Sequence, residues 1–292
     1  MHIPDGFLSI PVWATLTATS VPAVGYMARR AQSNLEESKI PLLGMMGAFV
    51  FAAQMLNFPV AAGTSAHLLG GALLTYTVGP AAASLVMTAI LAIQAFIFQD
   101  GGVLALGANV MNMAVVGVLV GYLPYHFLGA GRFRNAAIFL GAAASVLASA
   151  YFALAQIAVS GVPMPASLVS ISSTLFVISA AAEGAITLAV LKAIERIHPS
   201  WIRSPMRSNQ RTVKVLCALA AFIAVGVLFA SAYPDTLETA AERLGIASRS
   251  VSLMETPFAD YEWTLFDSDW LRKASAGIAG LLIVYLICTS LG

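Results

Sequence analysis

The chain has 292 residues, of which 59% are hydrophobic and only 10% charged, with a formal net charge of +1. Because soluble domains carry about 25% charged residues, this composition excludes a soluble globular protein and predicts a helical protein that crosses a membrane repeatedly. Both cysteines, Cys217 and Cys288, lie in apolar runs. They fit neither a disulfide framework nor a thiolate metal site.

The chain begins MHIPDGFLSIP, which is unlike a targeting segment. No Lys or Arg precedes the first apolar stretch, and Pro4 and Pro11 interrupt it. A secretory signal is therefore not expected, and we expect residue 1 to be the mature N-terminus.

Apolar runs of about 20 residues predict membrane-spanning helices. The chain has nine such runs, seven of them in its first two-thirds. They are 8–28, 40–57, 63–79, 80–99, 103–124, 136–159, 167–193, 213–232 and 274–291. The third and fourth runs meet at Gly79-Pro80, so the prediction depends on a tight turn there.

The basic residues predict the orientation of these spans. One alternate set of connections, with the adjoining helix ends, holds eleven of the fifteen Lys and Arg. The three short connections of the other set hold none, and only the long stretch 233–273 departs from the pattern, with the remaining four. The basic connections are 29–39, 79–80, 125–135 and 193–212; those without basic residues are 58–62, 99–102 and 160–166. Because basic connections stay inside, we expect the N-terminus outside and the C-terminus inside. The polar stretch 233–273 holds eight of the fourteen acids, and it is long enough to form a small unit outside.

Small residues recur four apart in the second span, at Gly44, Ala48 and Ala52. Such a ridge lets two helix backbones approach closely in lipid. It indicates either ordinary packing within the bundle or a docking face for another membrane subunit.

Two of the four histidines fall on the predicted outer side. His2 and His67 lie in the Gly- and Pro-broken stretches MHIPDG and AAGTSAHLLGG. His126 and His198 lie near inside basic connections, where a solvated or interfacial role is expected. A lone histidine in a span is more often a packing residue than a ligand, but ionisable groups at membrane depth also mark functional paths.

His2 offers a chelate that an internal histidine does not. With a free Met1 amine, three nitrogens follow one another: the α-amine, the His2 amide and the His2 imidazole. They close a five-membered and a six-membered ring in nearly one plane, which favours Ni(II) or Cu(II) over tetrahedral Zn(II). His67 is the candidate for the fourth corner. The alternative is a solvated N-terminal tail that binds no metal.

A second polar intrusion is the segment IQAFIFQDGGVLALGANVMNM. Its amides and its acid either cap helix ends or orient metal-binding imidazoles, which usually donate their other N–H to an oxygen. The candidates for the orienting role are Gln94, Asp100 and Asn109, together with Thr64 near His67. Glu183 in the seventh span receives no role in the metal site.

The sequence lacks the residues that several other functions would need. The chain has no HExxH and no GxxxxGK[ST], so it lacks the residues of a zinc protease and of a P-loop ATPase. The sequence also shows no convergent general acid and base, the pattern that would indicate an enzyme. An autonomous ion-coupled carrier or channel, with Asp100 and Glu183 as its charged path, remains an alternative.

Three motifs carry a resemblance to a known family: MHIPDGFLS, GTSAHLLGG and FQDGGVLALGANVMNM. In this order they resemble the CbiM/NikM family, the substrate-binding components of energy-coupling-factor transporters for nickel and cobalt. The resemblance covers about 1–200 and implies a seven-span metal-binding domain there. It implies that Met1, His2 and His67 hold the metal in a square plane.

The remainder, 201–292, resembles the small two-span accessory component (CbiN/NikN-like), here fused to the first. The stretch ASAYPDTLETAAERLG carries this resemblance, with Thr236 where the family commonly has glycine. The resemblance implies that Asp235 and Glu238 contact the binding domain from the extracytoplasmic loop 233–273. The alternative is a helix-capping Asp235.

The resemblance also implies partners. The chain would capture Ni2+ or Co2+ as substrate in a prokaryotic plasma (inner) membrane and pass it on through a membrane coupling subunit driven by two cytoplasmic ATPases. No organic cofactor and no nucleic-acid partner are expected, and the lipid bilayer is the surrounding medium. The sequence does not separate nickel from cobalt, although planar geometry slightly favours nickel.

Overall fold

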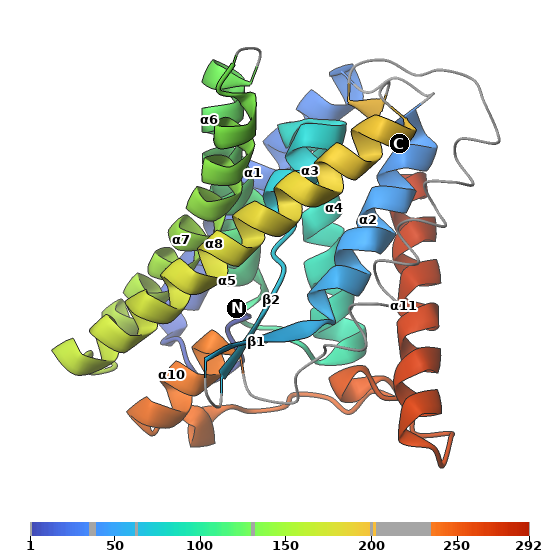
Figure 1. Cartoon of the computed structure of the whole chain (residues 1–292). Helices are drawn as coiled ribbons and strands as arrows, with labels where there is room; N and C mark the ends of the chain where they lie inside the picture. The colour runs from blue at the N-terminus through green and yellow to red at the C-terminus, as the bar shows by residue number, and fades with distance from the viewer. Residues whose placement is uncertain are drawn as a thin grey trace.

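The computed structural model describes residues 2–34, 39–61, 64–129, 132–198, 201–202 and 235–291. Met1 and the predicted span 213–232 lie outside these residues. The described part is a bundle of helices with a small β-hairpin at one end, beside the N-terminal segment (Figure 1). The first half of the bundle comprises α1 (Ile10–Asn34), α2 (Ile40–Gln54), β1 (Asn57–Ala61), β2 (Thr64–His67), α3 (Gly71–Val78), α4 (Pro80–Ile93) and the π-helix η2 (Gln94–Phe98).

The second half comprises α5 (Leu106–Asn109), the π-helix η3 (Val110–Gly117), α6 (Val118–Leu128), α7 (Arg134–Val159), α8 (Ala166–Ile197), α10 (Thr236–Leu244), the short 3-10 helices η5 (Ala247–Arg249) and η6 (Ala259–Tyr261), and α11 (Asp269–Ser290). Five helical stretches among the described residues are long and apolar enough to cross a membrane: Pro80–Phe98, Leu106–Leu128, Arg134–Val159, Ala166–Ile197 and Asp269–Ser290. Five of the predicted spans are therefore confirmed as helices long and apolar enough to cross a membrane, with shifted ends. The predicted spans 8–28 and 40–57 are helical too, as α1 and α2. The protein is a multi-pass membrane protein.

The third predicted span is wrong as a helix. The structure has the buried strand β2, a short loop and then α3, which is only eight residues long. The predicted tight turn does exist, because Gly79 has a φ of 85° between α3 and Pro80 of α4. The chain still leads from the hairpin end of the bundle to the end where α3 meets α4, but mostly without helix (Figure 1).

Non-helical backbone at membrane depth must be satisfied by the protein itself, and side chains do so here. Glu183 of α8 accepts hydrogen bonds from Leu69 N–H at 2.8 Å and Gly70 N–H at 2.9 Å. Gln54 of α2 donates to the Leu69 carbonyl at 2.7 Å. A helix-period reading of 63–79 misses this because its polar partners come from distant spans.

The small-residue ridge of α2 faces the chain's own last helix. α11 runs alongside α2 (Figure 1). A Cβ on Gly44 would lie 2.7 Å from Thr289 and 2.8 Å from Tyr285. Ala52 is buried and Ala48 is half-buried. At Gly44 the ridge therefore packs inside the chain against α11. The docking face at Gly44, Ala48 and Ala52 stays a prediction.

The amphipathic helix α10 closes the hairpin end. Its residues Leu237 and Ala241 are buried in a second apolar cluster with Ile3, Phe7 and Ile157. α10 also contacts α8 and β2. The C-terminal part of the chain thus packs directly on the N-terminal segment.

Candidate metal centre

The N-terminal segment is held inside the hairpin end of the bundle. Ile3 is fully buried and His2 is 8% exposed. Asn109 pairs with both peptide groups of Ile3: the Ile3 N–H donates to Oδ1 at 2.8 Å, and Nδ2 donates to the Ile3 carbonyl at 3.0 Å. The Gly102 N–H donates to the same carbonyl at 2.9 Å. A solvated N-terminal tail is therefore excluded from residue 2 onward.

Asp5 fastens the next turn of this segment. Its carboxylate accepts hydrogen bonds from Val103 N–H at 2.9 Å and Ala105 N–H at 3.0 Å. Gly102 lies so close that a Cβ there would be 2.1 Å from the Asp5 carboxylate. The glycines of FQDGG are thus needed for the backbone to approach the N-terminal fold-back.

The two outer-side histidines meet. The imidazoles of His2 and His67 stack with ring centroids 5.3 Å apart and an interplanar angle of 12°. His2 comes from the N-terminal segment and His67 from the end of β2. Both are less than one-tenth exposed, at 8% and 9%. The pairing of these two residues is the one that the sequence predicts.

Each ring nitrogen of His2 faces an oxygen. Nδ1 lies 2.9 Å from Asp100 Oδ1, and Nε2 lies 3.1 Å from Gln94 Oε1. The carboxylate oxygen of Asp100 is an acceptor. Gln94 Oε1 is an acceptor too, because Gln94 Nε2 donates to Gln54 Oε1 at 2.9 Å. The ring is therefore fully satisfied only when each nitrogen carries a proton or a cation. In the observed geometry a proton fits between Nδ1 and Asp100 Oδ1. A metal that takes Nδ1 replaces this proton and moves the Asp100 oxygen aside, while Nε2 keeps its proton toward Gln94.

His67 is arranged as a neutral donor. Its Nδ1 lies 3.0 Å from the Leu68 carbonyl, which favours a proton on Nδ1. A proton on Nδ1 leaves Nε2 with the lone pair that a metal requires. Nε2 lies 3.5 Å from Asp235 Oδ2.

The carboxylates of Asp100 and Asp235 flank the two imidazoles. Burial alone would raise the pKa of Asp100, but the charge of His2 and its hydrogen bond outweigh burial and hold that pKa below its ordinary value. Asp100 therefore stays ionised. Two ionised carboxylates beside two imidazoles make a site whose charge a divalent cation balances.

Asp235 has both of the roles that the sequence left open. Its Oδ1 accepts from Leu237 N–H at 2.7 Å and Glu238 N–H at 2.8 Å, while Glu238 Oε2 accepts from Asp235 N–H at 2.8 Å, which completes a capping box. Its Oδ2 faces His67. Glu238 completes the cap and makes no hydrogen bond to the histidines among the described residues. The Thr236 hydroxyl donates to the Ser65 carbonyl at 3.2 Å. The turn therefore forms without the usual glycine.

Three of the four residues predicted to orient the imidazoles lie at His2, and the fourth does not. Gln94 and Asp100 hold the His2 ring, and Asn109 holds the backbone beside it. Thr64 instead accepts from the Thr239 hydroxyl of α10 at 3.3 Å. This hydrogen bond links β2 to α10 and does not orient either imidazole. Gln94 begins one π-helix and Asn109 precedes the other, and such widened turns often occur at functional sites.

Three further residues belong to the site and were not predicted: Gln54, Glu183 and Tyr261. Gln54 and Glu183 hold the loop after His67, and Tyr261 donates to Asp100 Oδ2 at 2.5 Å. Polar residues in apolar helices are a usable signal for the first two. No sequence pattern marks Tyr261.

Side chains alone do not supply a complete set of metal ligands here. Across the described residues, no group of three or more His, Cys, Asp and Glu side chains forms such a cluster. The predicted ligand set takes its other donors from main-chain nitrogens. One of these, the Met1 α-amine, lies outside the described residues.

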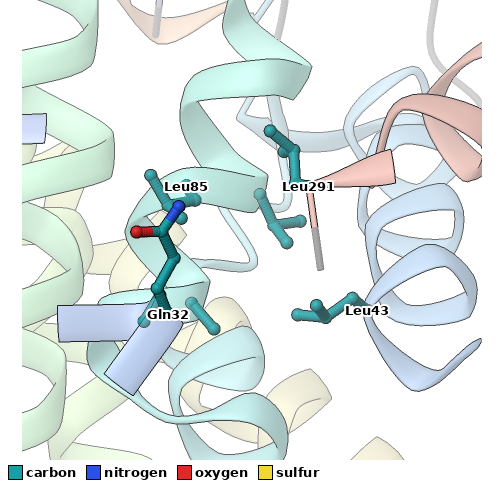
Figure 2. Close-up of a pocket in the computed structure, with 7 residues that line it drawn as sticks. Gln32, Leu43, Leu85 and Leu291 are labelled. Carbon is teal, nitrogen blue, oxygen red and sulfur yellow. The ribbon is translucent and has the colours of Figure 1, made fainter. Parts of the chain in front are cut away.

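One cavity of the described bundle lies away from the two histidines. A cavity of about 90 Å³ opens between the end of α1, α2, α4 and the end of α11, with Gln32, Leu43, Leu85 and Leu291 on its walls (Figure 2). Six of its seven lining residues are apolar, and it lies at the end of the bundle opposite the histidines.

Known proteins match both the chain and this architecture. The family model described as the cobalt uptake substrate-specific transmembrane region matches residues 2–201. The putative fused nickel transport protein NikMN of Archaeoglobus fulgidus is 37% identical over 293 residues, 97% of this chain and 95% of that protein. The cobalt transport protein CbiM of Salmonella typhimurium is 35% identical over 163 residues, 54% of this chain and 66% of that protein.

A solved structure agrees with these matches. The crystal structure of a truncated transition metal transporter has a TM-score of 0.57 and 31% sequence identity, and the match covers 68% of this chain and all of that one. The resemblance drawn from the three motifs is thus confirmed. This chain belongs to the family of the cobalt uptake substrate-specific transmembrane region, and it matches a putative fused nickel transport protein along nearly its whole length.

Proposed function

We propose that this chain binds a divalent transition metal, Ni2+ or Co2+, as its substrate at the outer face of the membrane. It delivers that metal across the membrane as the substrate-specific component of an ATP-driven energy-coupling-factor transporter. The observation that carries this proposal is the burial of His2 against His67, between Asp100 and Asp235.

The proposed ligands are four nitrogens: the Met1 α-amine, the His2 amide, His2 Nδ1 and His67 Nε2. The hydrogen-bonding pattern supports the two ring nitrogens, because His2 Nε2 faces Gln94 and His67 Nδ1 faces Leu68. A planar nitrogen set suits Ni(II) better than Zn(II) or Mg(II). It admits Co(II) as well, so the relative affinities for the two metals are an outcome to measure.

The proposed topology has nine spans, with the N-terminus outside and the C-terminus inside a prokaryotic plasma membrane. Residues 1–200 form the metal-binding domain, and 201–292 form a two-span accessory unit with its loop 233–273 outside. The positions of charged residues support this orientation. Arg134 at the start of α7 pairs with Glu195 near the end of α8, at the end remote from the histidines, as basic inside connections require.

The proposed energy source is external to this chain. The sequence contains no P-loop, so a membrane coupling subunit and two cytoplasmic ATPases would drive the reorientation of the binding component. The rival is an autonomous ion-coupled carrier or channel with Asp100 and Glu183 as its charged path. Both carboxylates are instead committed to the site, Asp100 to His2 and Glu183 to the loop after His67.

Uptake of radioactive Ni2+ into sealed vesicles separates these two functions. We expect no uptake by this chain alone, and uptake when the coupling subunit, the ATPases and ATP are present. A His67→Ala variant in the full complex is the control and should abolish uptake. Metal-dependent uptake by the chain alone, driven by an ion gradient, would establish the carrier instead.

A further inference from the structure

Tyr261 of the C-terminal part touches both side chains that hold the His2 ring. Its phenol donates to Asp100 Oδ2 at 2.5 Å and accepts from Gln94 Nε2 at 3.0 Å. Asp100 and Gln94 in turn face Nδ1 and Nε2 of His2. One hydroxyl, about 160 residues further along the sequence, therefore connects to both ring nitrogens of His2 through a single intervening side chain each.

The orientation of the Gln94 amide depends on this hydroxyl. The Gln94 Nε2 group donates to Gln54 Oε1 at 2.9 Å and to Tyr261 at 3.0 Å. With both amide protons used in this way, the Gln94 carbonyl must point at His2. Asp100 is fixed similarly, because Tyr261 occupies one carboxylate oxygen and leaves the other for the ring.

The Tyr261 ring is placed by aromatic packing. It stacks on Phe98 with centroids 4.9 Å apart and lies 6.1 Å from the ring of Phe51. Phe258 packs on the same Phe98 at 5.8 Å, and the Thr256 hydroxyl donates to the Ile97 carbonyl at 2.6 Å. The loop before α11 is therefore docked against η2 by contacts that do not need the Tyr261 hydroxyl.

The backbone on both sides of this contact is strained. Among the described residues, the non-glycine positions with positive φ are Gln99, Asp260 and Tyr261, at 56°, 54° and 57°. Such conformations persist only where the surroundings impose them, and they cluster at functional sites. All three adjoin or form the Asp100–Tyr261 hydrogen bond, so the strain lies where the two parts of the chain meet.

We propose that Tyr261 is a positioning residue of the metal site: its hydroxyl aligns Asp100 and Gln94, and through them the His2 imidazole, for the metal. This inference rests on the proposed function. It makes the C-terminal unit part of the site, since a group from that unit orients a ligand held by the N-terminal domain. Burial and the neighbouring Asp100 raise the pKa of Tyr261 well above its ordinary value, so the phenol keeps its proton and stays a donor.

The test compares Tyr261→Phe with Phe258→Leu in the full chain. Ni2+ titration is followed by the visible absorption of the planar Ni(II) centre, beside size-exclusion profiles and thermal unfolding in detergent. Tyr261→Phe keeps the stacked ring and removes only the hydroxyl, so we expect about 10–100-fold weaker Ni2+ binding and a shifted spectrum. Phe258→Leu loosens the packing and should keep the spectrum. In an Asp100→Asn background, Tyr261→Phe should add less, because the two residues act through one network.

Each outcome decides one question. Wild-type affinity and spectrum in Tyr261→Phe would overturn the positioning role. So would equal losses in Tyr261→Phe and Phe258→Leu, or a Tyr261→Phe chain that no longer folds, since the residue would then be structural. Failure of the wild-type chain to bind Ni2+ or Co2+, or undiminished binding by His67→Ala, would instead overturn the proposed function.

Discussion

At the scale of single residues, Asn109 is the clearest example of one side chain fixing the N-terminal segment. It donates to one peptide group of Ile3 and accepts from another, because the amide carries a separate donor and acceptor. Asn109→Asp would keep the acceptor but place a carboxylate oxygen against the Ile3 carbonyl. We expect about tenfold or greater loss of Ni2+ affinity, measured by equilibrium titration.

A matched control for this variant lies nearby in the same helical stretch. The Asn112 side chain exchanges two hydrogen bonds with Gln156 of α7, and it makes none to the described part of the N-terminal segment. Asn112→Asp should therefore lower thermal stability without a comparable loss of Ni2+ affinity. Equal affinity losses in both variants would show that Asn109 acts through general stability.

Glu183 is a structural anchor for the loop that carries His67. Its two oxygens accept from two backbone N–H groups at 2.8 and 2.9 Å. Glu183→Gln leaves one acceptor and turns an N–H group toward a backbone donor. Because each unsatisfied buried donor costs about 1–3 kcal/mol, we expect a clearly lower unfolding temperature and weaker Ni2+ binding.

The comparison for Glu183 is the carboxylate of Glu195, which pairs with Arg134. This pair is partly exposed, so Glu195→Gln should cost about 1 kcal/mol or less and leave Ni2+ binding unchanged. Thermal unfolding in detergent and metal titration measure both variants. A Glu183→Gln chain that unfolds and binds like the wild type would contradict the anchoring role.

At the scale of elements, the approach of α11 to α2 depends on glycine. A Cβ on Gly280 would lie 2.3 Å from Phe51 and 2.8 Å from Phe98. Gly280→Ala must therefore push apart the aromatic rings that support Tyr261, at a cost of about 1–3 kcal/mol. Thermal unfolding in detergent measures this loss.

Gly25 in α1 provides the matched control, because a Cβ there meets nothing within 4 Å. Gly25→Ala is expected to leave the unfolding temperature unchanged or raise it, since alanine is the better helix former. An unchanged Gly280→Ala variant would mean that α2 and α11 separate easily.

The elements also show what the sequence could and could not predict. Long apolar runs gave the helices α7 and α8 nearly to their ends, because lipid allows little else. The segment around His67 has the same apolar composition yet forms β2 and a short loop. Glu183 and Gln54 make that backbone possible, and no local periodicity reports partners that come from other spans.

At the scale of the whole molecule, the proposed topology puts the candidate metal centre and the start of α7 on opposite sides of the membrane. Asp267 is exposed in the loop before α11, and Arg132 is exposed before α7. With both native cysteines replaced, Asp267→Cys in intact cells should react with a membrane-impermeant maleimide. Arg132→Cys should react only after the membrane is opened. The reverse pattern would invert the proposed topology.

The sequence predicts only part of the candidate metal centre, because some of its residues come together only in the fold of the whole chain. His2 and His67 could be paired from their Gly- and Pro-broken motifs and their shared side of the membrane. The contributions of Asp235 and Tyr261 depend on the fold of the C-terminal unit over the N-terminal segment. Asp235 was anticipated from a family resemblance, whereas Tyr261 required the observed contact with Asp100.

The central claim is that the N-terminus itself, together with His67, holds the transported metal. Metal analysis of the purified chain tests it most directly, beside His67→Ala and a variant with one extra residue before Met1. The account predicts Ni2+ or Co2+ bound to the unmodified chain and lost from both variants, because one lacks an imidazole and the other displaces the α-amine. An extended chain that still binds metal as tightly would contradict it.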